Sequence, residues 1–165
     1  MGADIHIYAE RKLKNGSWAA VSDFSYKTNT VFNEAPPKNG SPWFWPKINS
    51  RNYDFFAELA SVRGDGAEPR GLPDDVSPLV AEEAILWSGD GHSHSWMSAR
   101  EFVPIFMRHH MTKDEVVKAI KDRVGGNSAE ETLANVVEDH IGIRVPEENA
   151  KYAFDNLRFV FWFDN

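Results

Sequence analysis

The sequence predicts an α+β domain with a small, mainly antiparallel sheet and several helices on one side of it. Segments with strand periodicity stand at the beginning and at the end of the chain, and segments with helix periodicity lie between them. With 165 residues the chain fits one domain, residues 1–165, around a single core. Because the two ends of a domain often lie close together, we expect the first and last strands to be neighbours in the sheet.

The first predicted strand covers residues 4–10, along which polar and apolar side chains alternate strictly. An Asn-Gly pair after it predicts a tight turn, so residues 18–21 return as the second strand of a hairpin. Residues 22–50 contain four prolines and show no periodicity, which predicts a long loop, either a lid or a cover for the core. Residues 157–163 are almost continuously apolar, which predicts a central strand buried on both faces.

Capping signals and the helical spacing of apolar residues predict five helices between these strands. Three of them open with a capping box, in which Ser or Thr is followed three residues later by Glu. Glycines after several of the segments are typical of helix ends. The predicted helices are residues 51–62, 77–87, 99–110, 113–124 and 129–141.

Composition narrows the classes of function. The chain has no cysteine, which excludes disulfides, zinc–thiolate sites and thiol nucleophiles and suits a cytoplasmic protein. A net charge of -7 and a pI of about 5.3 disfavour duplex nucleic acid as a partner, because like charges repel at long range. No leader or membrane-spanning stretch is visible, so we expect a cytoplasmic location and no membrane partner. The sequence leaves the oligomeric state open.

The segment from Trp87 to Trp96, Trp-Ser-Gly-Asp-Gly-His-Ser-His-Ser-Trp, concentrates the residue types that carry chemistry. It places Asp90, His92 and His94 within five residues. In an extended segment alternate side chains point the same way, so these three groups are expected to converge.

The first strand adds a second set of polar groups. Asp4 and His6 share its polar face, and aspartate is disfavoured in strands unless it serves a purpose. Imidazole and carboxylate groups are the ligands that Zn, Mn or Ni takes where no thiolate is present. We therefore predict a divalent-metal site, with zinc, manganese or nickel as the cofactor, formed by Asp4, His6, His92 and His94.

Cationic and aromatic side chains accompany these groups. Arg51 and Tyr53 stand at the start of the first predicted helix, where backbone N–H groups favour an anion. A connector between prolines holds Arg70 in place. Tryptophans at both ends of the histidine segment offer stacking surfaces. The predicted catalytic residues are Asp90, Arg51 and Arg70, and the predicted substrate-binding residues are Tyr53, Arg63, Trp87 and Trp96.

Three interpretations of this constellation stay open. In the first, metal-bound hydroxide hydrolyses a phosphoester or nucleotide bond while the arginines stabilise the transferring phosphoryl group. In the second, the protein binds a small phosphate-bearing or nucleotide ligand without chemistry. In the third, the histidines donate hydrogen bonds to loop carbonyls and organise the fold.

Five blocks of the chain resemble an uncharacterised family of small proteins encoded by tailed bacteriophages and prophages. The resemblance implies an accessory phage protein in the bacterial host cytoplasm, where such proteins often act on nucleotide metabolism or nucleotide signalling. It makes the binding alternative a sponge-like protein that counters host signalling. Family members commonly carry Cys before Asp-Ile-His, whereas this chain has Ala3, so a cysteine ligand is not available there. The blocks are Asp4-Ile-His6, Arg51-Asn-Tyr53 followed by Phe56 and Leu59, Pro69-Arg-Gly-Leu-Pro73 with Asp75-Val-Ser77, Asp90-Gly-His-Ser-His-Ser-Trp96, and Phe161-Trp-Phe-Asp-Asn165.

Overall fold

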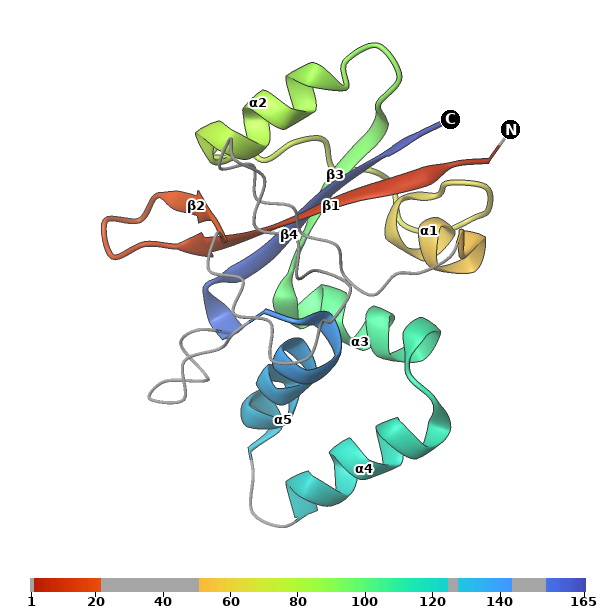
Figure 1. The fold of residues 1–165 in the computed structure, drawn as a ribbon, viewed down its shortest axis with the longest axis vertical. Helices are drawn as coiled ribbons and strands as arrows, with labels where there is room; N and C mark the ends of the chain where they lie inside the picture. The colour runs from red at the N-terminus through yellow and green to blue at the C-terminus, as the bar shows by residue number, and fades with distance from the viewer. Residues whose placement is uncertain (1, 22–50, 125–127, 144–153) are drawn as a thin grey trace, which may run out of the picture.

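The computed structural model describes residues 2–21, 51–124, 128–143 and 154–165, so the predicted loop at 22–50 lies outside the described residues. The described strands form an antiparallel sheet in the order β2-β1-β4-β3 (Figure 1). They are β1 (Asp4–Lys12), β2 (Trp18–Ala20), β3 (His92–Ser98) and β4 (Leu157–Asp164). The helices are α1 (Tyr53–Ala60), α2 (Pro78–Leu86), α3 (Ala99–His110), α4 (Lys113–Val124) and α5 (Ala129–Val136), which continues into the π-helical turn η2 (Val137–Ile141).

The first and last strands are neighbours, which confirms the α+β prediction. The pairing of β1 with β4 runs from Asp4 opposite Asp164 to Arg11 opposite Leu157. β2 extends the sheet beyond β1, and β3 extends it beyond β4. The two ends of the chain therefore lie side by side at one end of the sheet (Figure 1).

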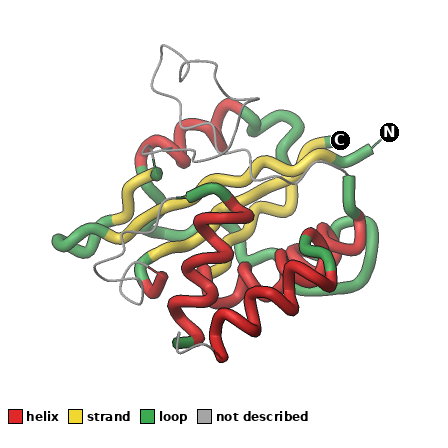
Figure 2. The backbone as a smooth tube through the Cα atoms, turned by 60° about the horizontal axis from the view of Figure 1, so that its bottom comes forward, coloured by secondary structure: helices red, strands yellow, loops and turns green. Residues whose placement is uncertain are grey.

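One face of the sheet carries the main core. Phe159, Phe161 and Phe163 are fully buried on this face of β4. The ring of Phe102 on α3 stacks on Phe159 at 4.2 Å, and Phe56 on α1 meets Phe163 at 5.1 Å. Helices cross this side of the sheet in Figure 2. The expectation of several helices on one side is confirmed.

Of the described helices, α2 packs on the opposite face. Its residues Val80 and Ala84 are buried against Val160 and Trp162 of β4. The Tyr8 hydroxyl donates a hydrogen bond to Glu83 Oε2 at 3.3 Å and ties α2 to β1. We call this side of the sheet the α2 face. Since both faces of the central strands are covered, His6 and Tyr8 of β1 are partly buried and Glu10 is fully buried, whereas Asp4 at the start of the strand is exposed.

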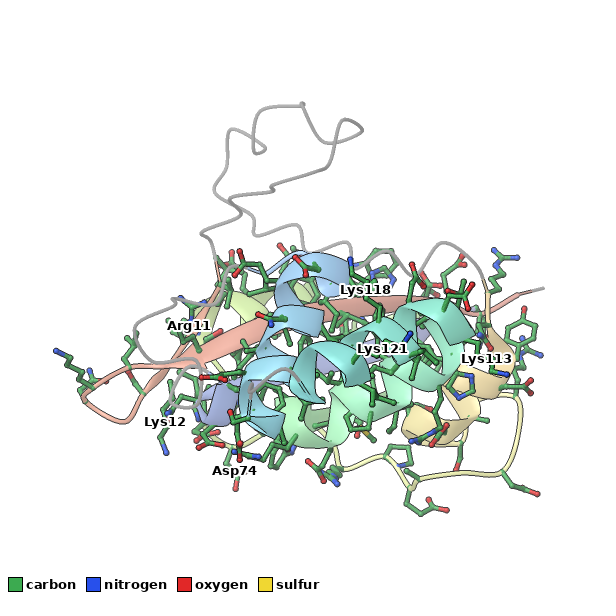
Figure 3. The ribbon with its side chains drawn as sticks, turned by 90° about the horizontal axis from the view of Figure 1, so that it is seen from below. Arg11, Lys12, Asp74, Lys113, Lys118 and Lys121 are labelled. Atoms are coloured by element: carbon green, nitrogen blue, oxygen red, sulfur yellow. The ribbon has the colours of Figure 1, made fainter. Side chains whose placement is uncertain are left out.

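The helix α4 lies at the periphery of the main-core side and packs on α5. Lys113, Lys118 and Lys121 project along it in Figure 3, and all three are exposed. Part of its apolar stripe also remains in contact with water, with Val117 37% and Ile120 53% exposed. The helix therefore contributes little to the main core.

All three predicted capping boxes form, whereas the predicted N-cap residue Ser77 does not cap its helix through its side chain. It stands at the N-cap of α2, as predicted, but its hydroxyl makes no capping bond and is buried without a partner among the described residues. The Ser77 backbone N–H instead donates to Glu10 Oε1 at 2.6 Å. The capping boxes are Ser98 with Glu101, Thr112 with Glu115, and Ser128 with Glu131.

Glu10, which binds the Ser77 backbone, belongs to a buried ion cluster on the α2 face. Glu10 is fully buried, and its Oε2 accepts a hydrogen bond from Arg158 Nε at 2.6 Å. The same guanidinium donates to the side chain of Asp75 at 2.6 Å and to its backbone carbonyl at 3.0 Å. It lies over the Trp18 ring at 4.0 Å, which adds a cation–π contact. The cluster fixes the segment before α2 onto β1 and β4.

The last residue of α3, His110, makes the stability of the fold depend on pH. Its ring packs edge-on against Phe55 at 4.6 Å, and its Nε2 is buried without a partner in the described part of the chain. Burial, with a smaller effect of the neighbouring His109, lowers the pKa of His110 to about 4. An unfolded histidine titrates near pH 6.5, so the unfolded state takes up this proton first as the pH falls.

The stabilisation linked to His110 is therefore complete above about pH 6.5 and is lost as the pH falls towards 4. Between pH 7 and pH 5, the titration of His110 is expected to lower the free energy of unfolding by about 2 kcal/mol. Urea unfolding at both pH values should show a smaller loss for His110→Phe than for the wild type. Glu58 also has a shifted pKa: burial raises this pKa, but hydrogen bonds from His109 and Arg108 lower it overall. The effect of Glu58 on stability is the same in the wild type and in His110→Phe, so it cancels in the comparison. Equal losses in the two proteins would show that His110 is not the group that titrates.

Candidate active site

A histidine and a carboxylate meet on the α2 face where β1 begins and β4 ends. His6 Nε2 lies 3.0 Å from Asp164 Oδ2, and the two side chains are 21% and 18% exposed. The strand register produces this contact, because Asp4 is opposite Asp164 and His6 is opposite Trp162. Alternate residues of the two strands therefore point to the same face. We call this pair the His6–Asp164 dyad.

Aromatic rings enclose the imidazole of His6. The Trp87 ring, just after α2, lies 4.1 Å from it, and the Trp162 ring lies nearly parallel to it at 5.9 Å. Trp162 also stacks with Tyr8 at 5.0 Å and with His94 at 5.5 Å. Burial and the neighbouring His92 lower the pKa of His94, so this imidazole is neutral at neutral pH. The five rings form the aromatic cluster of His6, Tyr8, Trp87, His94 and Trp162.

The turn from Trp87 to Gly91 closes over this cluster. The Trp87 carbonyl accepts hydrogen bonds from the N–H groups of Asp90 at 3.1 Å and Gly91 at 2.6 Å. A Cβ atom at Gly91 would lie 2.8 Å from the Trp87 carbonyl oxygen and 3.3 Å from Cδ1 of Trp162. Glycine is thus required for the turn to approach the indole this closely.

The structure brings several predicted residues to the same end of the sheet. Asp4 binds Arg51 through two hydrogen bonds of 2.7 Å and 2.9 Å. The bond from Arg51 lowers the pKa of Asp4. Arg51 precedes α1 instead of beginning it, since the helix starts at Tyr53. Arg63 Nη2 lies 3.4 Å from the side-chain oxygen of Asn165, the residue that follows β4.

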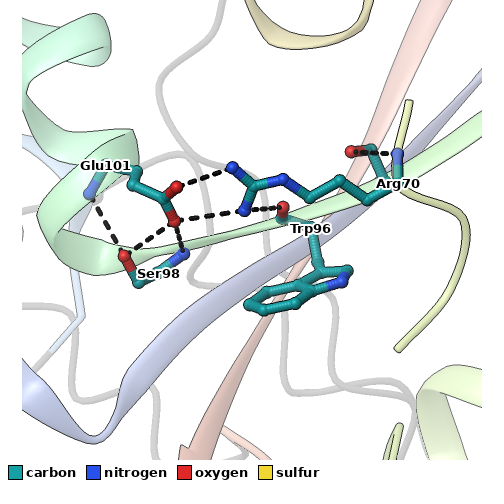
Figure 4. Close-up of polar contacts among 5 residues, drawn as sticks. Arg70, Trp96, Ser98 and Glu101 are labelled. Carbon is teal, nitrogen blue, oxygen red and sulfur yellow. Dashed lines mark hydrogen bonds and ion pairs between the residues drawn. The ribbon is translucent and has the colours of Figure 1, made fainter. Parts of the chain in front are cut away.

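Arg70 and Trp96 lie elsewhere. Arg70 donates two hydrogen bonds to the carboxylate of Glu101 and lies 5.3 Å from the Trp96 ring (Figure 4). These bonds lower the pKa of Glu101 to about 2, against a smaller opposing effect of burial. Trp96 is paired with Val160, towards the middle of β4, so Arg70 does not join Arg51 at the His6–Asp164 dyad. The arginine instead holds the start of α3 in place.

The predicted alternation of His92 and His94 is interrupted by a β-bulge. The register of β3 shifts between His92 and Ser95, and Ser93 adopts a φ of 52°. The His92 ring approaches Phe163 at 6.3 Å, whereas His94 stacks on Trp162, and these two partners belong to opposite faces of β4. The extra residue of a bulge moves the following side chain to the other face, so the two imidazoles do not converge.

Two further predicted residues are exposed. Asp90 lies in the turn that covers the aromatic cluster, where its backbone N–H helps to close the turn. Tyr53 begins α1 and packs edge-on against Phe56 at 5.9 Å. Neither side chain forms part of the His6–Asp164 dyad.

The predicted metal ligands are engaged with other groups. Asp4 binds Arg51 and His6 binds Asp164, whereas His94 stacks on Trp162. His92 Nδ1 lies 3.0 Å from the Ser93 hydroxyl, and its Nε2 is buried without a partner among the described residues. Within the described ranges, no three histidine or acidic side chains are arranged to hold a metal ion. The described side chains alone do not complete a divalent-ion site. Zinc, manganese or nickel binding stays a prediction for elemental analysis to test.

Sequence reasoning missed Asp164, the partner of His6, and treated Trp162 only as part of a buried strand. A signal for Asp164 existed. Once the first and last strands are predicted to pair, an acidic residue at the end of one falls near Asp4 and His6 at the start of the other.

Comparison with protein-family models, with curated proteins and with solved structures finds no match to this chain. The site must therefore be interpreted from its own geometry. None of the helices in the described ranges has the length and apolar character needed to cross a membrane.

Proposed function

We propose that this protein hydrolyses a phosphate-bearing, nucleotide-like ligand and that the His6–Asp164 dyad is its acid–base centre. The observation that supports this proposal is the position of His6, with Nε2 3.0 Å from the Asp164 carboxylate and its ring in contact with two indoles. A carboxylate that accepts the Nε2 proton selects one tautomer, and the lone pair then resides on Nδ1. Imidazole also exchanges protons readily near neutral pH, as a general base requires.

The proposed reaction is a hydrolysis in which His6 carries the proton. His6 Nδ1 takes a proton from water as the water oxygen forms a bond to phosphorus. The phosphorus–oxygen bond to the leaving group breaks, and the leaving oxygen takes the proton back from the imidazolium. Arg51 lies near the same end of β1, where it can bind the phosphoryl oxygens once the ligand shares it with Asp4.

The ligand class follows from the groups around the His6–Asp164 dyad. Trp87 is partly exposed beside His6 and offers an aromatic face for a planar base. A guanidinium near an aromatic face suits a nucleotide better than an apolar ligand. An accessory phage protein in a bacterial cytoplasm would meet such ligands in host metabolism or signalling.

Ligand binding without turnover is the second candidate. One observation favours it: Arg51 is neutralised by Asp4 through two short hydrogen bonds, which weakens its stabilisation of a transition state. A binding protein needs only the aromatic face and a phosphate donor, and it returns its ligand unchanged.

Incubation with cyclic and linear nucleotides, with and without EDTA, tests the proposal. If the His6–Asp164 dyad is the acid–base centre, product should still form in the presence of EDTA. The metal content of the same protein sample is measured in parallel. Activity that disappears in EDTA and returns with zinc, manganese or nickel would replace the dyad mechanism with the metal-dependent one. Saturable binding of an unchanged nucleotide would favour the binding protein instead.

A further inference from the structure

Trp162 carries a buried hydrogen-bond donor that the fold does not use. Its side chain is fully buried, and its indole N–H has no partner among the described residues. Trp18 provides a contrast, because its indole N–H donates to Asp75 at 3.0 Å. Buried polar groups normally have partners, and an unpartnered one is a position where water or a ligand acceptor is expected.

The surroundings of this donor place it in the candidate site. The Trp162 ring stacks near His6 and His94, and the turn ending at Gly91 covers it. The Cδ1 atom, which is bonded to Nε1, is the part of the indole that lies nearest Gly91. The edge that carries the N–H thus faces the turn beside the His6–Asp164 dyad and not the main core.

The outer side of the turn is open to solvent. A Cβ atom at Gly89 would meet nothing within 4 Å, and Asp90 is exposed. Trp87, which ends α2 and begins this turn, has its ring 4.1 Å from that of His6, so a displacement of the turn that includes Trp87 is the one the proposal requires. One displacement would therefore uncover the imidazole and the Trp162 N–H together.

We propose that Trp162 is the residue that recognises the base of the ligand. Its N–H donates a hydrogen bond to a ring nitrogen or carbonyl oxygen of a planar heteroaromatic base when the turn opens. This inference rests on the proposed function and narrows its substrate class to nucleotides, as distinct from sugar phosphates and other phosphate esters without a base. A ligand without such an acceptor leaves the Trp162 donor unpaired and binds more weakly.

NMR of protein with ¹⁵N-labelled indole groups tests this directly. The probes are the 5′-monophosphates of adenosine, guanosine, cytidine and uridine, with ribose 5-phosphate as the probe that lacks a base. We expect at least one nucleotide, but not ribose 5-phosphate, to shift the assigned Trp162 N–H resonance and to slow its exchange with solvent. An unchanged Trp162 resonance at saturating nucleotide, or no binding of any of the four nucleotides, would overturn the inference.

A substitution provides the quantitative test. Trp162→Phe removes the donor and should weaken binding of the shifting nucleotide by roughly tenfold, with the affinity for ribose 5-phosphate unchanged. Trp18→Phe is the matched control, since it removes an indole N–H outside the site and should leave both affinities unchanged. If Trp162→Phe does not fold, the wild-type spectrum decides the question. If ribose 5-phosphate, which has no nucleobase, is hydrolysed as fast as the nucleotides, the role of Trp162 is refuted and the hydrolase proposal stands. If a nucleotide shifts the Trp162 resonance but is not hydrolysed, the hydrolase proposal is refuted and the role of Trp162 stands.

Discussion

Replacing His6 with glutamine is expected to lower the turnover of a nucleotide substrate by about 10²- to 10⁴-fold. Glutamine keeps a side-chain N–H that can donate to Asp164, but it cannot take up and return a proton at neutral pH. The loss should therefore appear mainly in kcat, with a smaller change in KM. Asp164→Asn should reduce kcat less, because the imidazole remains and loses only the group that orients it.

His109→Gln is the matched control for this experiment. His109 Nε2 lies 2.7 Å from Glu58 Oε2, so it forms a similar histidine–carboxylate pair away from the α2 face. This variant should retain wild-type turnover. If both glutamine variants lose activity equally, or if His6→Gln remains fully active, His6 is not the base. Thermal unfolding of each variant separates loss of chemistry from loss of fold.

Replacing Glu10 with alanine is expected to lower the free energy of unfolding by about 3–5 kcal/mol. The substitution removes the carboxylate that accepts hydrogen bonds from Arg158 and from the Ser77 backbone. The Arg158 side chain is only 4% exposed, so water cannot replace the lost partner. Arg158 keeps its bonds to the exposed Asp75 but loses its only buried carboxylate partner among the described residues, and removing one partner of a buried ion pair is strongly destabilising. Urea unfolding near pH 7 measures the effect.

Asp75→Asn is the companion variant, because it alters the exposed end of the same cluster. The Asp75 side chain is 62% exposed and contacts the same guanidinium, so its replacement should cost at most about 1 kcal/mol. The double variant Glu10→Leu with Arg158→Met removes both buried charges and should be more stable than Glu10→Ala. A larger loss for Asp75→Asn than for Glu10→Ala would disprove this account of the cluster.

Local patterns predicted much of the fold. The helices at 99–110 and 113–124 have the predicted bounds, because their starting signals are local hydrogen bonds between residues three apart. The predicted helix at 129–141 forms as α5 followed by η2. The pairing of β1 with β4 was predictable because each segment has strand character and because the chain ends of a domain tend to meet.

Longer-range features were not predictable from the same patterns. Strict alternation along β1 distinguishes two faces, but it does not reveal that α2 covers the polar one and buries Glu10. A register shift at Ser93 depends on pairing with β4, so the spacing of His92 and His94 could not show which faces they occupy. Among the candidate site residues, Asp4, His6 and Arg51 lie at the same end of the sheet, whereas Arg70, in the connector before α2, is held by Glu101 on α3.

The separation of 158 positions between His6 and Asp164 also determines when the dyad can form. Each partner comes from a different central strand, and joining the two strands closes a very long loop, which is an entropically costly and slow kind of contact. During synthesis, His6 emerges long before Asp164 and has no carboxylate partner until β4 has been translated. The proposed general base would thus be assembled by one of the latest folding events, and a chain interrupted before β4 would carry the imidazole without the group that orients it.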